Sequence, residues 1–366
     1  MSPRVAVVGA GPVGLFQALA LHQAGIEPVV LERRTEPHRG SRSIGIHPPS
    51  LEALEALDLV EPFLAAGVQV RRGHAVGDGA PIGTVDFTRC GGRYPFVLAL
   101  PQHRTEALLE AALAERVPGA LRRGAEVRSL EARDDAVSLD TASGPLEVDW
   151  VVACDGRRSR VRELLGIPFA VEAYEGEYGM EDHPDQTPYG DDAAVFLTEA
   201  GLVESFPLPG GGRRWVARTD GAPLRDTIRA RTGFELPADG STSSFRAERG
   251  LAGTFVRGRV VLGGDAAHVV SPIGGQGMNL GWLGANRITR ALGLAMRGEP
   301  DALARDARVR RRMAKAAARR AEANMWLGRP TAQGVWRERL VGALMRRPLV
   351  DGLARAFTMR GLRWGV

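Results

Sequence analysis

A strand–turn–helix–strand pattern at the start of the chain limits the fold more than any other feature of the sequence. Arg4–Val8 is a short run rich in β-branched residues, and it leads into the glycine-spaced segment Gly9–Gly14. An apolar helical pattern follows, and a second strand is expected at Pro28–Leu31. This order is typical of a parallel βαβ unit, so the sequence predicts an α/β protein with a Rossmann-like domain.

The spacing of three glycines in the first turn indicates what the turn can bind. Gly9 permits a tight turn, Gly11 lets a pyrophosphate approach the backbone, and Gly14 allows the helix to lie close to the strand. Glu32 follows the second strand, where a carboxylate can accept hydrogen bonds from a ribose 2′-hydroxyl. Together these residues predict a dinucleotide site, and the alternative is chance glycines in an ordinary βαβ turn.

Two later segments repeat the order of buried strand, acidic residue and helix start. Val148–Ala153 is followed by Asp155 and by an arginine-rich helix start that Ser159 can cap. Val260–Leu262 is followed by Asp265 and a glycine-dense loop. Asp265 is placed to accept hydrogen bonds from sugar-like hydroxyls, and the helix start after it offers free N–H donors. A helix-capping turn at Asp155 and purely structural glycines around Asp265 are the alternatives to a ligand site.

The length of 366 residues exceeds a typical single core, so two intergrown lobes are expected. Alternating apolar and polar residues with glycine-rich turns predict a β-sheet lobe inserted into the α/β domain. We assign residues 1–69, 97–172 and 250–326 to the α/β domain, 70–96 and 173–249 to the lobe, and 327–366 to a C-terminal helical tail. Three large side chains of the lobe are candidates for the wall of a pocket for a flat apolar substrate, with plain core packing as the alternative: Phe196, Phe206 and Trp215.

Composition argues against several other functions. The two cysteines, Cys90 and Cys154, lack metal-ligand spacing, so we expect no metal site and a reduced, cytoplasmic protein. No apolar run approaches the ~18 residues that span a bilayer, and the first strand begins too early for a signal peptide. The net charge of +5 comes almost entirely from arginine, with Lys315 as the only lysine. The arginine-rich segment 301–326 lacks interleaved aromatic residues, which favours a solvated helix face over a nucleic-acid or membrane patch.

The three motifs, in this order, resemble those of the class A flavoprotein monooxygenases with the para-hydroxybenzoate hydroxylase fold. The motifs are Gly9-x-Gly11-x-x-Gly14, then Asp155-Gly156 with Ser159, Val161 and Arg162, then Gly264-Asp265 through Pro272 to Gly275-Gln276-Gly277 and Asn279. The resemblance implies an FAD-binding domain, NADPH or NADH as electron donor, and O2 as co-substrate. It also implies a flavin C4a-hydroperoxide that hydroxylates an aromatic or polycyclic small molecule, in keeping with secondary metabolism.

The same resemblance implies roles for individual residues. Arg42 and Pro272 would lie beside the flavin as catalytic residues, and His47 joins the three lobe residues as a candidate for the substrate pocket, with a structural role as the alternative. Cofactor contacts are expected from residues along the three motifs and near them: Gly9, Gly11, Val13, Gly14, Glu32, Arg33, Arg42, Gln102, Val127, Asp155, Gly264, Asp265, Pro272, Gly275, Gln276, Gly277, Met278 and Asn279.

Three alternative functions share this fold. An epoxidase or reductase of an isoprenoid stays open, because the sequence does not tell what the lobe encloses. A flavin-binding protein without turnover is a second alternative, although Arg42, Asp155, Asp265 and Pro272 argue against it. A flavin-dependent halogenase is disfavoured, because such enzymes use a lysine in the tunnel to the substrate and Lys315 lies in a late helix. The oligomeric state is left open, and no oligomerisation through a thioredoxin-like third domain is expected.

Overall fold

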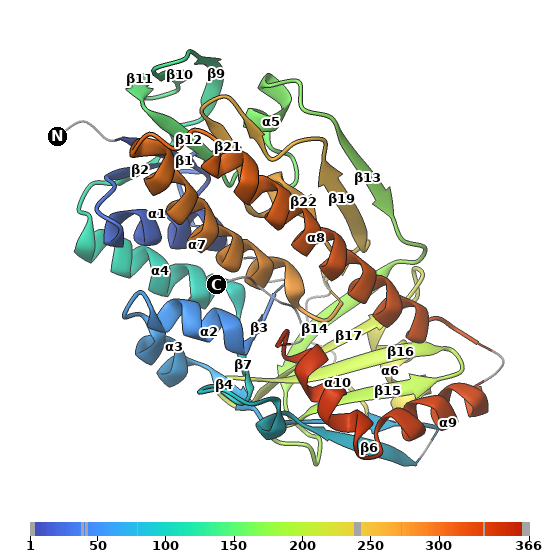
Figure 1. The fold of residues 1–366 in the computed structure, drawn as a ribbon. Coiled ribbons are helices and arrows are strands. Elements are labelled where there is room, and N and C mark those ends of the chain that lie inside the picture. The colour runs from blue at the N-terminus through green and yellow to red at the C-terminus, as the bar shows by residue number, and fades with distance from the viewer. Residues whose placement is uncertain are drawn as a thin grey trace.

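The computed structural model describes residues 4–37, 40, 43–78, 80–237, 243–271, 273–331 and 334–360. An α/β part contains the N-terminal strand, and a β-sheet lobe lies at the opposite end of the molecule, with the last helices packed over it (Figure 1). This arrangement confirms the predicted fold class, a Rossmann-like domain with an inserted sheet and C-terminal helices. Arg42 and Pro272, the two predicted catalytic residues, lie outside the described residues.

A six-stranded, mostly parallel sheet forms the centre of the α/β part. Its strands, in spatial order, are β20 (Val256–Arg257), β21 (Val260–Leu262), β12 (Trp150–Ala153), β1 (Val5–Val8), β2 (Pro28–Glu32) and β8 (Leu121–Arg123). Only β20 runs antiparallel to its neighbour. The four strands between the two edges are short and apolar apart from Glu32 at the end of β2, as expected for strands covered on both faces.

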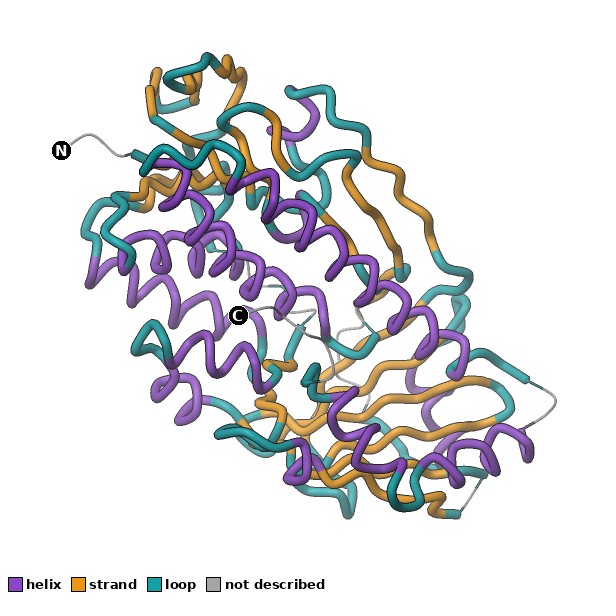
Figure 2. The backbone as a smooth tube through the Cα atoms, viewed as in Figure 1, coloured by secondary structure: helices purple, strands orange, loops and turns teal. Residues whose placement is uncertain are grey.

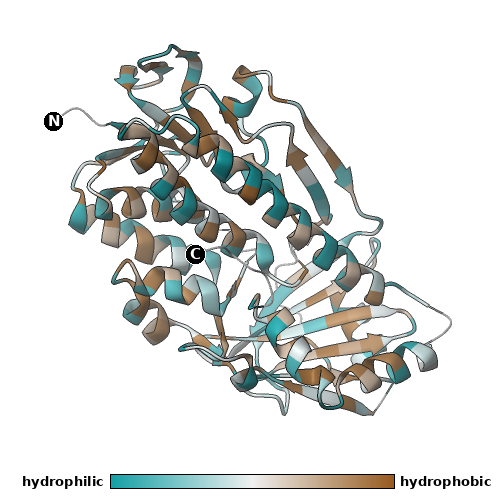
Figure 3. Cartoon of the chain, viewed as in Figure 1, coloured by the Kyte–Doolittle hydropathy of each residue, from teal (hydrophilic) through white to brown (hydrophobic). Residues whose placement is uncertain are grey.

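Four helices cover one side of this sheet or flank it. They are α1 (Pro12–Gln23), α4 (Gln102–Arg116), α7 (Gln276–Met296) and α8 (Ala302–Leu327). Helix α1 packs between α4 and α7 (Figure 2). Phe16 of α1 stacks on Trp282 of α7 with ring centroids 5.3 Å apart. Helix α8 alternates between hydrophilic and hydrophobic residues along its length (Figure 3). None of the helices in the described ranges is long and apolar enough to cross a membrane.

Smaller elements complete the α/β part. One small sheet joins β9 (Val127–Ala132), β10 (Val137–Thr141) and β11 (Gly144–Val148). A second joins β13 (Phe169–Ala173), β19 (Glu248–Ala252) and β22 (His268–Val269). A third joins β3 (Gly45–Ile46), β7 (Val97–Ala99) and β4 (Val68–Val70). The short helices of this part are α2 (Pro48–Glu55), α3 (Val60–Ala66), α5 (Arg160–Leu164) and η2 (Gly264–Ala266). A further short helix, η1 (Phe87–Cys90), belongs to the segment assigned to the lobe.

The start of α2 corrects one expectation. Ser50 before Leu51 and Glu52 predicts a helix that begins at Ser50, with Ser50 as its cap. The helix instead begins at Pro48, with His47 at the capping position. Two prolines fit the first turn, because the first N–H groups of a helix have no intrahelical partner. Ser50 is therefore buried inside the helix rather than at its end.

The lobe contains a seven-stranded sheet built from two separated segments of the chain. In spatial order its strands are β18 (Ser243–Phe245), β14 (Tyr178–Pro184), β17 (Gly212–Arg218), β16 (Gly201–Leu208), β15 (Ala193–Thr198), β5 (Arg72–Val76) and β6 (Pro81–Asp86). Strands β15 and β5 pair in parallel and the others pair antiparallel. The two segments that the sequence assigns to the lobe therefore contribute to one sheet.

The two faces of this sheet have different neighbours. Helix α6 (Leu224–Thr232) covers what we call the outer face, which carries Ala194, Phe196, Val203, Trp215 and Ala217. The opposite, inner face carries Met180, Val195, Glu204, Phe206 and Val216, since residues directly opposite one another on paired strands point to the same side. Helices α9 (Gly334–Leu344) and α10 (Leu349–Phe357) and the end of α8 pack against the inner face.

Candidate functional site

Three strand ends from distant parts of the chain meet at one edge of the six-stranded sheet. Val8 of β1 lies opposite Ala153 of β12, and Ala153 lies opposite Leu262 of β21. The register continues past the strands, because Cys154 N donates to Val8 O at 2.7 Å and Gly263 N donates to Ala153 O at 2.8 Å. The three motifs therefore form one continuous edge at the carboxyl ends of parallel strands, where ligands of such sheets bind.

The glycines of the first motif differ in what surrounds them. A Cβ atom at Gly9, which has φ +103°, would lie 2.5 Å from the carbonyl oxygen of Cys154. A Cβ atom at Gly14 would lie only 1.9 Å from the carbonyl oxygen of Gly9. At Gly11 no atom lies within 4 Å of that position, and no side chain caps the helix that begins after it. Gly9 and Gly14 thus allow close packing, whereas Gly11 leaves the N-terminus of α1 open to an anion.

Val13 connects the first and third motifs through packing. Its side chain would be 3.2 Å from a Cβ atom at Gly264 and 2.4 Å from one at Gly281 of α7. Both glycines are therefore needed for α1 to approach η2 and α7 this closely. The side chain of Val13 serves this contact, and the cofactor contact predicted for this residue stays a prediction.

Glu32 lies buried at the carboxyl end of β2. Its Oε2 accepts a hydrogen bond from Ala10 N at 2.8 Å, and its Oε1 accepts one from Arg34 N at 3.0 Å. A carboxylate has about four acceptor positions, so two hydrogen bonds leave capacity for sugar hydroxyls. Glu32 therefore holds the first glycine turn against β2 and fits the ribose contact predicted for it. Its neighbour Arg33 is exposed.

Asp155 follows β12 and is held by the start of α5. Ser159 Oγ accepts a hydrogen bond from Arg162 N at 3.0 Å, which confirms the predicted helix cap. Asp155 Oδ2 accepts one from Val161 N at 3.1 Å, while Oδ1 is buried without a hydrogen-bond partner in the part of the chain the structure describes. Burial raises the pKa of this carboxyl. An unpartnered buried acceptor at the edge of the site fits a ligand donor such as a cofactor hydroxyl.

Asp265 is the exposed acidic residue of the third motif. It lies in η2 directly after Gly264, whose φ of +53° is left-handed, and follows the carboxyl end of β21. An exposed carboxylate at this edge fits the predicted bonds to sugar-like hydroxyls. Val127, also predicted to contact the cofactor, has its side chain buried in the core formed with β10.

The N-terminus of α7 is fixed by the side chain of Asn279. Its Nδ2 donates to the carbonyl oxygens of Gly45 at 2.9 Å and Gly275 at 2.8 Å, and its Oδ1 accepts from His47 N at 2.8 Å. Gly275 has φ +64° and no side chain caps the helix, so its first N–H groups stay free for a ligand. Gln276, Gly277 and Met278 form that first turn, and Gln276 Oε1 is buried without a hydrogen-bond partner among the described residues.

His47 lies at this loop rather than in the lobe. A Cβ atom at Gly275 would be 3.6 Å from His47 Nε2, and Nδ1 is buried without a hydrogen-bond partner among the described residues. Burial lowers the pKa of His47 to about 4, so the ring is neutral near pH 7. His47 therefore packs beside the loop before α7, and it carries no positive charge there.

Gln102 holds the segment that follows Arg42. Gln102 N donates to Ser43 O at 3.0 Å, and Ser43 N donates to Gln102 Oε1 at 3.4 Å. Gln102 Nε2 also donates to Glu106 Oε1 at 2.8 Å, one turn further along α4. The position of Gln102 is thus fixed on both sides, and the cofactor roles of Arg42, Pro272 and Gln102 stay predictions.

The three aromatic residues predicted for the substrate pocket are not brought together. Phe196 and Trp215 stack with ring centroids 6.0 Å apart on the outer face, where they pack with Leu224 and Ile228 of α6. Phe206 is half-buried on the inner face, against the core that α10 helps to form. Alternation along the strands separates them, because Phe206 points to the other side of the sheet. Phe196 and Trp215 therefore serve as core residues of the lobe, and only Phe206 lies on the inner face.

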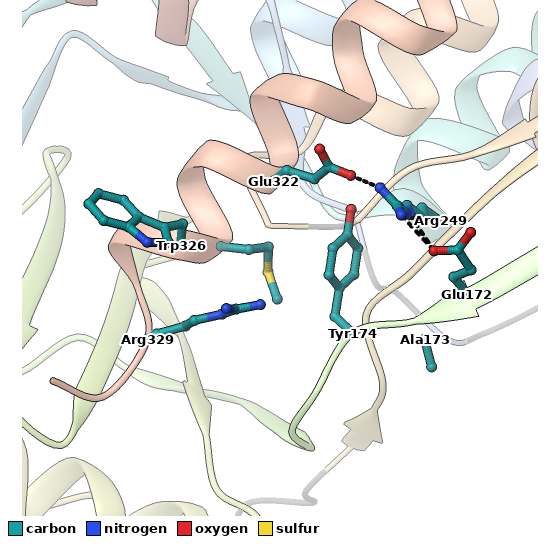
Figure 4. A pocket seen from close by; sticks show the side chains of 8 residues that line it. Glu172, Ala173, Tyr174, Arg249, Glu322, Trp326 and Arg329 are labelled. Atoms are coloured by element: carbon teal, nitrogen blue, oxygen red, sulfur yellow. Dashed lines mark hydrogen bonds and ion pairs between the residues drawn. The ribbon is translucent and has the colours of Figure 1, made fainter.

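A cavity of about 380 Å³ lies between the β13–β19 pair and the end of α8 (Figure 4). Its lining residues are Glu172, Ala173, Tyr174, Arg249, Glu322, Met325, Trp326 and Arg329. Arg249 donates to Glu172 at 2.6 Å and also pairs with Glu322. Met325 is shared with the inner face, because Tyr178 Oη donates to its Sδ at 3.7 Å and Ile273 packs in the same cluster. Sequence analysis missed this cavity, since its walls come from three separate segments without a motif.

Comparison with known proteins places the chain in a family. A family model described as FAD binding domain matches residues 3–200 and 217–321. Rifampicin monooxygenase of Streptomyces venezuelae is 36% identical over 303 residues, which cover 76% of this chain and 61% of that protein. The chain spans about three fifths of the length of this relative and of the anhydrotetracycline monooxygenase of Streptomyces rimosus.

Two solved structures extend the comparison. The anhydrotetracycline hydroxylase OxyS from Streptomyces rimosus has a TM-score of 0.82 and 32% identity, with 99% of this chain and 77% of that chain covered. The p-nitrophenol 4-monooxygenase from Pseudomonas putida DLL-E4 has a TM-score of 0.90 at 24% identity, with 99% of each chain covered, and this likeness concerns the fold.

The fold and the motif edge define an FAD-binding flavoprotein. Because the family model covers most of the sequence, the chain belongs to the FAD-binding-domain family of the class A flavoprotein monooxygenases.

Proposed function

We propose that this protein is an FAD-dependent monooxygenase that uses NADPH or NADH and O2 to hydroxylate an aromatic or polycyclic small molecule. The observation that carries the proposal is the meeting of the three motifs at one sheet edge, with the loop before α7 in contact with the inner face of the lobe through Ile273 and Tyr178. Bound FAD would supply the electron transfer and the activation of O2. The relatives named for rifampicin and anhydrotetracycline support a polycyclic substrate in secondary metabolism.

Different residues of the edge would contact different parts of the cofactor. The open N-terminus of α1 behind Gly11 would face the pyrophosphate, Glu32 the adenosine ribose, and Asp265 the ribityl chain. Asp155, with its unpartnered Oδ1, would accept a bond from the cofactor or the nicotinamide nucleotide. The uncapped start of α7 would donate N–H groups toward negative charge on the flavin.

The lobe would hold the substrate beside this edge. Its inner face carries Phe206 as a flat apolar surface, and the C-terminal helices close the same face from the other side. Enclosure of this kind would keep water from the reacting atoms until oxygen transfer is complete. Arg42 and Pro272 would then lie at the flavin, between the two parts of the site.

The visible spectrum of the purified protein, followed by NADPH or NADH addition in air with candidate phenols, tests the proposal. The expected result is a flavin spectrum that bleaches faster when a substrate is present, together with a product that carries one additional oxygen atom. A bound flavin that neither nucleotide reduces would favour a flavin-binding protein without turnover. An oxygenated isoprenoid, with no oxygenated phenol, would favour an epoxidase.

A further inference from the structure

Glu204 occupies the middle of the inner face of the lobe. It lies on β16, directly opposite Val195 of β15 and Val216 of β17, so its side chain points to the same side as Phe206. Val216 lies opposite Met180 of β14, and Tyr178, two residues before Met180, points to the same side of the sheet. Glu204 is therefore surrounded in the sheet by apolar residues and sits on the side that the FAD-binding part and the C-terminal helices cover.

Other carboxylates of this sheet and of the loop beside it have partners, whether buried or exposed. Asp182 pairs with Arg214 at 2.6 Å, Asp185 with Arg213 at 2.9 Å, Glu181 with His183 at 2.8 Å, and Asp192 with His74 at 3.0 Å. The side chain of Glu204 makes no hydrogen bond or ion pair with any residue that the structure describes. A shielded carboxylate without a partner is costly, which makes this position unusual in a sheet that pairs its other acids.

The surroundings of Glu204 contain charged groups, but each of them is engaged elsewhere. Arg214 is bound to Asp182, and Arg218 donates to Asp220 at 2.7 Å. On α9, Arg337 donates to backbone carbonyls, including that of Arg329 at 2.9 Å. Tyr178 is a further polar neighbour: Glu204 and Arg329 both act electrostatically on it, and its hydroxyl donates to Met325 Sδ. No cation thus neutralises Glu204 from the described strands or helices packed around it.

Glu204 is enclosed but not fully packed. Burial raises the pKa of Glu204 to about 7. The residue nevertheless keeps partly accessible surface, unlike Val203 and Ser205 on either side of it, which are fully buried. Glu204 is therefore the shielded acid of this strand that a small molecule can still reach.

We propose that Glu204 is the base that accepts the hydroxyl proton of a phenolic or enolic substrate held against the inner face of the lobe, an inference that rests on the proposed function. The substrate O–H bond breaks, its electron pair stays on the substrate oxygen, and the proton moves to a Glu204 carboxylate oxygen. The resulting oxyanion makes the neighbouring ring carbons electron-rich and ready to accept oxygen. Because Glu204 is anionic before this transfer, the pocket selects a neutral hydroxyl at this position over a substrate carboxylate.

The test compares wild-type and Glu204→Gln holoenzymes on a panel of phenol, para-nitrophenol, pentachlorophenol, anhydrotetracycline and rifampicin. For a weakly acidic hydroxyl, the wild-type kcat should rise through about pH 7, and the variant should lose that rise and about 10²–10⁴-fold in kcat. Pentachlorophenol, which its chlorines keep ionised at neutral pH, needs no base and should lose little. Unchanged kcat and pH profile with the weakly acidic substrate would overturn the proposal.

Two further variants separate a catalytic effect from a structural one. Glu204→Asp keeps the carboxyl and should restore part of the pH-dependent rise. Glu131→Gln removes an exposed charge on β9 and should leave kcat and its pH profile unchanged. If the wild type hydroxylates no compound of the panel, the proposed function fails, and binding of phenol to the oxidised FAD complex tests Glu204 separately. Affinity should then strengthen as pH rises through about 7 in the wild type only; the same pH dependence in Glu204→Gln would overturn the proposal.

Discussion

The sheet edge of the α/β part and the sheet of the lobe build their surfaces in opposite ways. At the edge, Gly9 and Gly14 leave no room for a side chain, and α1 and α7 begin without a side-chain cap, so backbone N–H groups join a few carboxylates in forming the site. In the lobe, the backbone is regular and the side chains decide what each face does, with Trp215 in a core and Glu204 in an enclosed space. A site formed by backbone groups keeps its shape when side chains are substituted. A site formed by side chains changes its shape and charge with each substitution.

This difference explains how related proteins share a cofactor and differ in substrate. The family match runs through all three motifs, yet the relatives are named for compounds as different as rifampicin and anhydrotetracycline. A substitution on the inner face alters shape and charge without moving the strands. We therefore expect substitutions at the edge to affect folding and FAD together, and substitutions on the inner face to affect substrate first.

The largest effect is expected from Gly14→Ala. Its Cβ would lie 1.9 Å from the carbonyl oxygen of Gly9, so α1 must move away from the sheet. We expect a loss of more than about 4 kcal/mol of unfolding free energy and of bound FAD, measured by urea denaturation and flavin absorbance. Gly11→Ala is the matched control, since its Cβ meets no protein atom; it should keep apoprotein stability and weaken FAD binding only. Equal stability losses in both variants would contradict the distinction between the two glycines.

The second prediction separates the two faces of the lobe. Trp215→Ala should cost about 3–5 kcal/mol of unfolding free energy, because it removes a buried ring from the core beneath α6. Phe206→Ala should cost less, because that ring is only half-buried, and should instead raise KM for an aromatic substrate. Denaturation curves and steady-state kinetics of both variants check this. A larger rise in KM for Trp215→Ala than for Phe206→Ala would show that the faces are assigned the wrong way round.

The third prediction uses the pH dependence of stability. The pKa of Glu204 is raised from 4.5 to about 7, so the folded state holds a proton that the unfolded state releases between these values. Stability therefore falls as pH rises through this range, and the loss persists above pH 7. Glu204→Gln should stabilise the protein by up to about 3 kcal/mol at pH 8 and have little effect at pH 4.5. Thermal unfolding at both pH values measures this, and equal shifts at both would contradict the enclosed position of the carboxyl.

The smallest effect is expected from Asp265→Ala. The side chain is exposed, so apoprotein stability should change little, whereas FAD should lose hydrogen bonds worth about 1.5–3 kcal/mol. Fluorescence titration of the apoprotein with FAD measures the change in Kd. An unchanged Kd would remove Asp265 from the set of cofactor ligands and leave the cofactor to the backbone of this edge.

The two regions also differ in how far the sequence predicts them. The glycine motifs predict the α/β fold, and the Ser159 cap and the FAD-binding family are confirmed, because spacing in the sequence directly reflects backbone geometry. The face to which Phe196 or Trp215 points depends on register and on which helix covers the sheet, and neither is local information. No sequence pattern singled out Glu204, because what distinguishes it is the absence of a charged or hydrogen-bonding partner for its side chain among the described residues, and only the three-dimensional structure shows that.

The interleaving of the two parts has a consequence for folding during synthesis. The six-stranded sheet takes β21 from residues 260–262, and the inner face of the lobe is covered by α9 and α10 from residues 334–357. Neither core is complete until the last third of the chain has left the ribosome. Such non-local contacts slow folding and delay closure of the apolar surfaces, so the nascent chain exposes its core residues for longer than a chain of the same length with sequential domains.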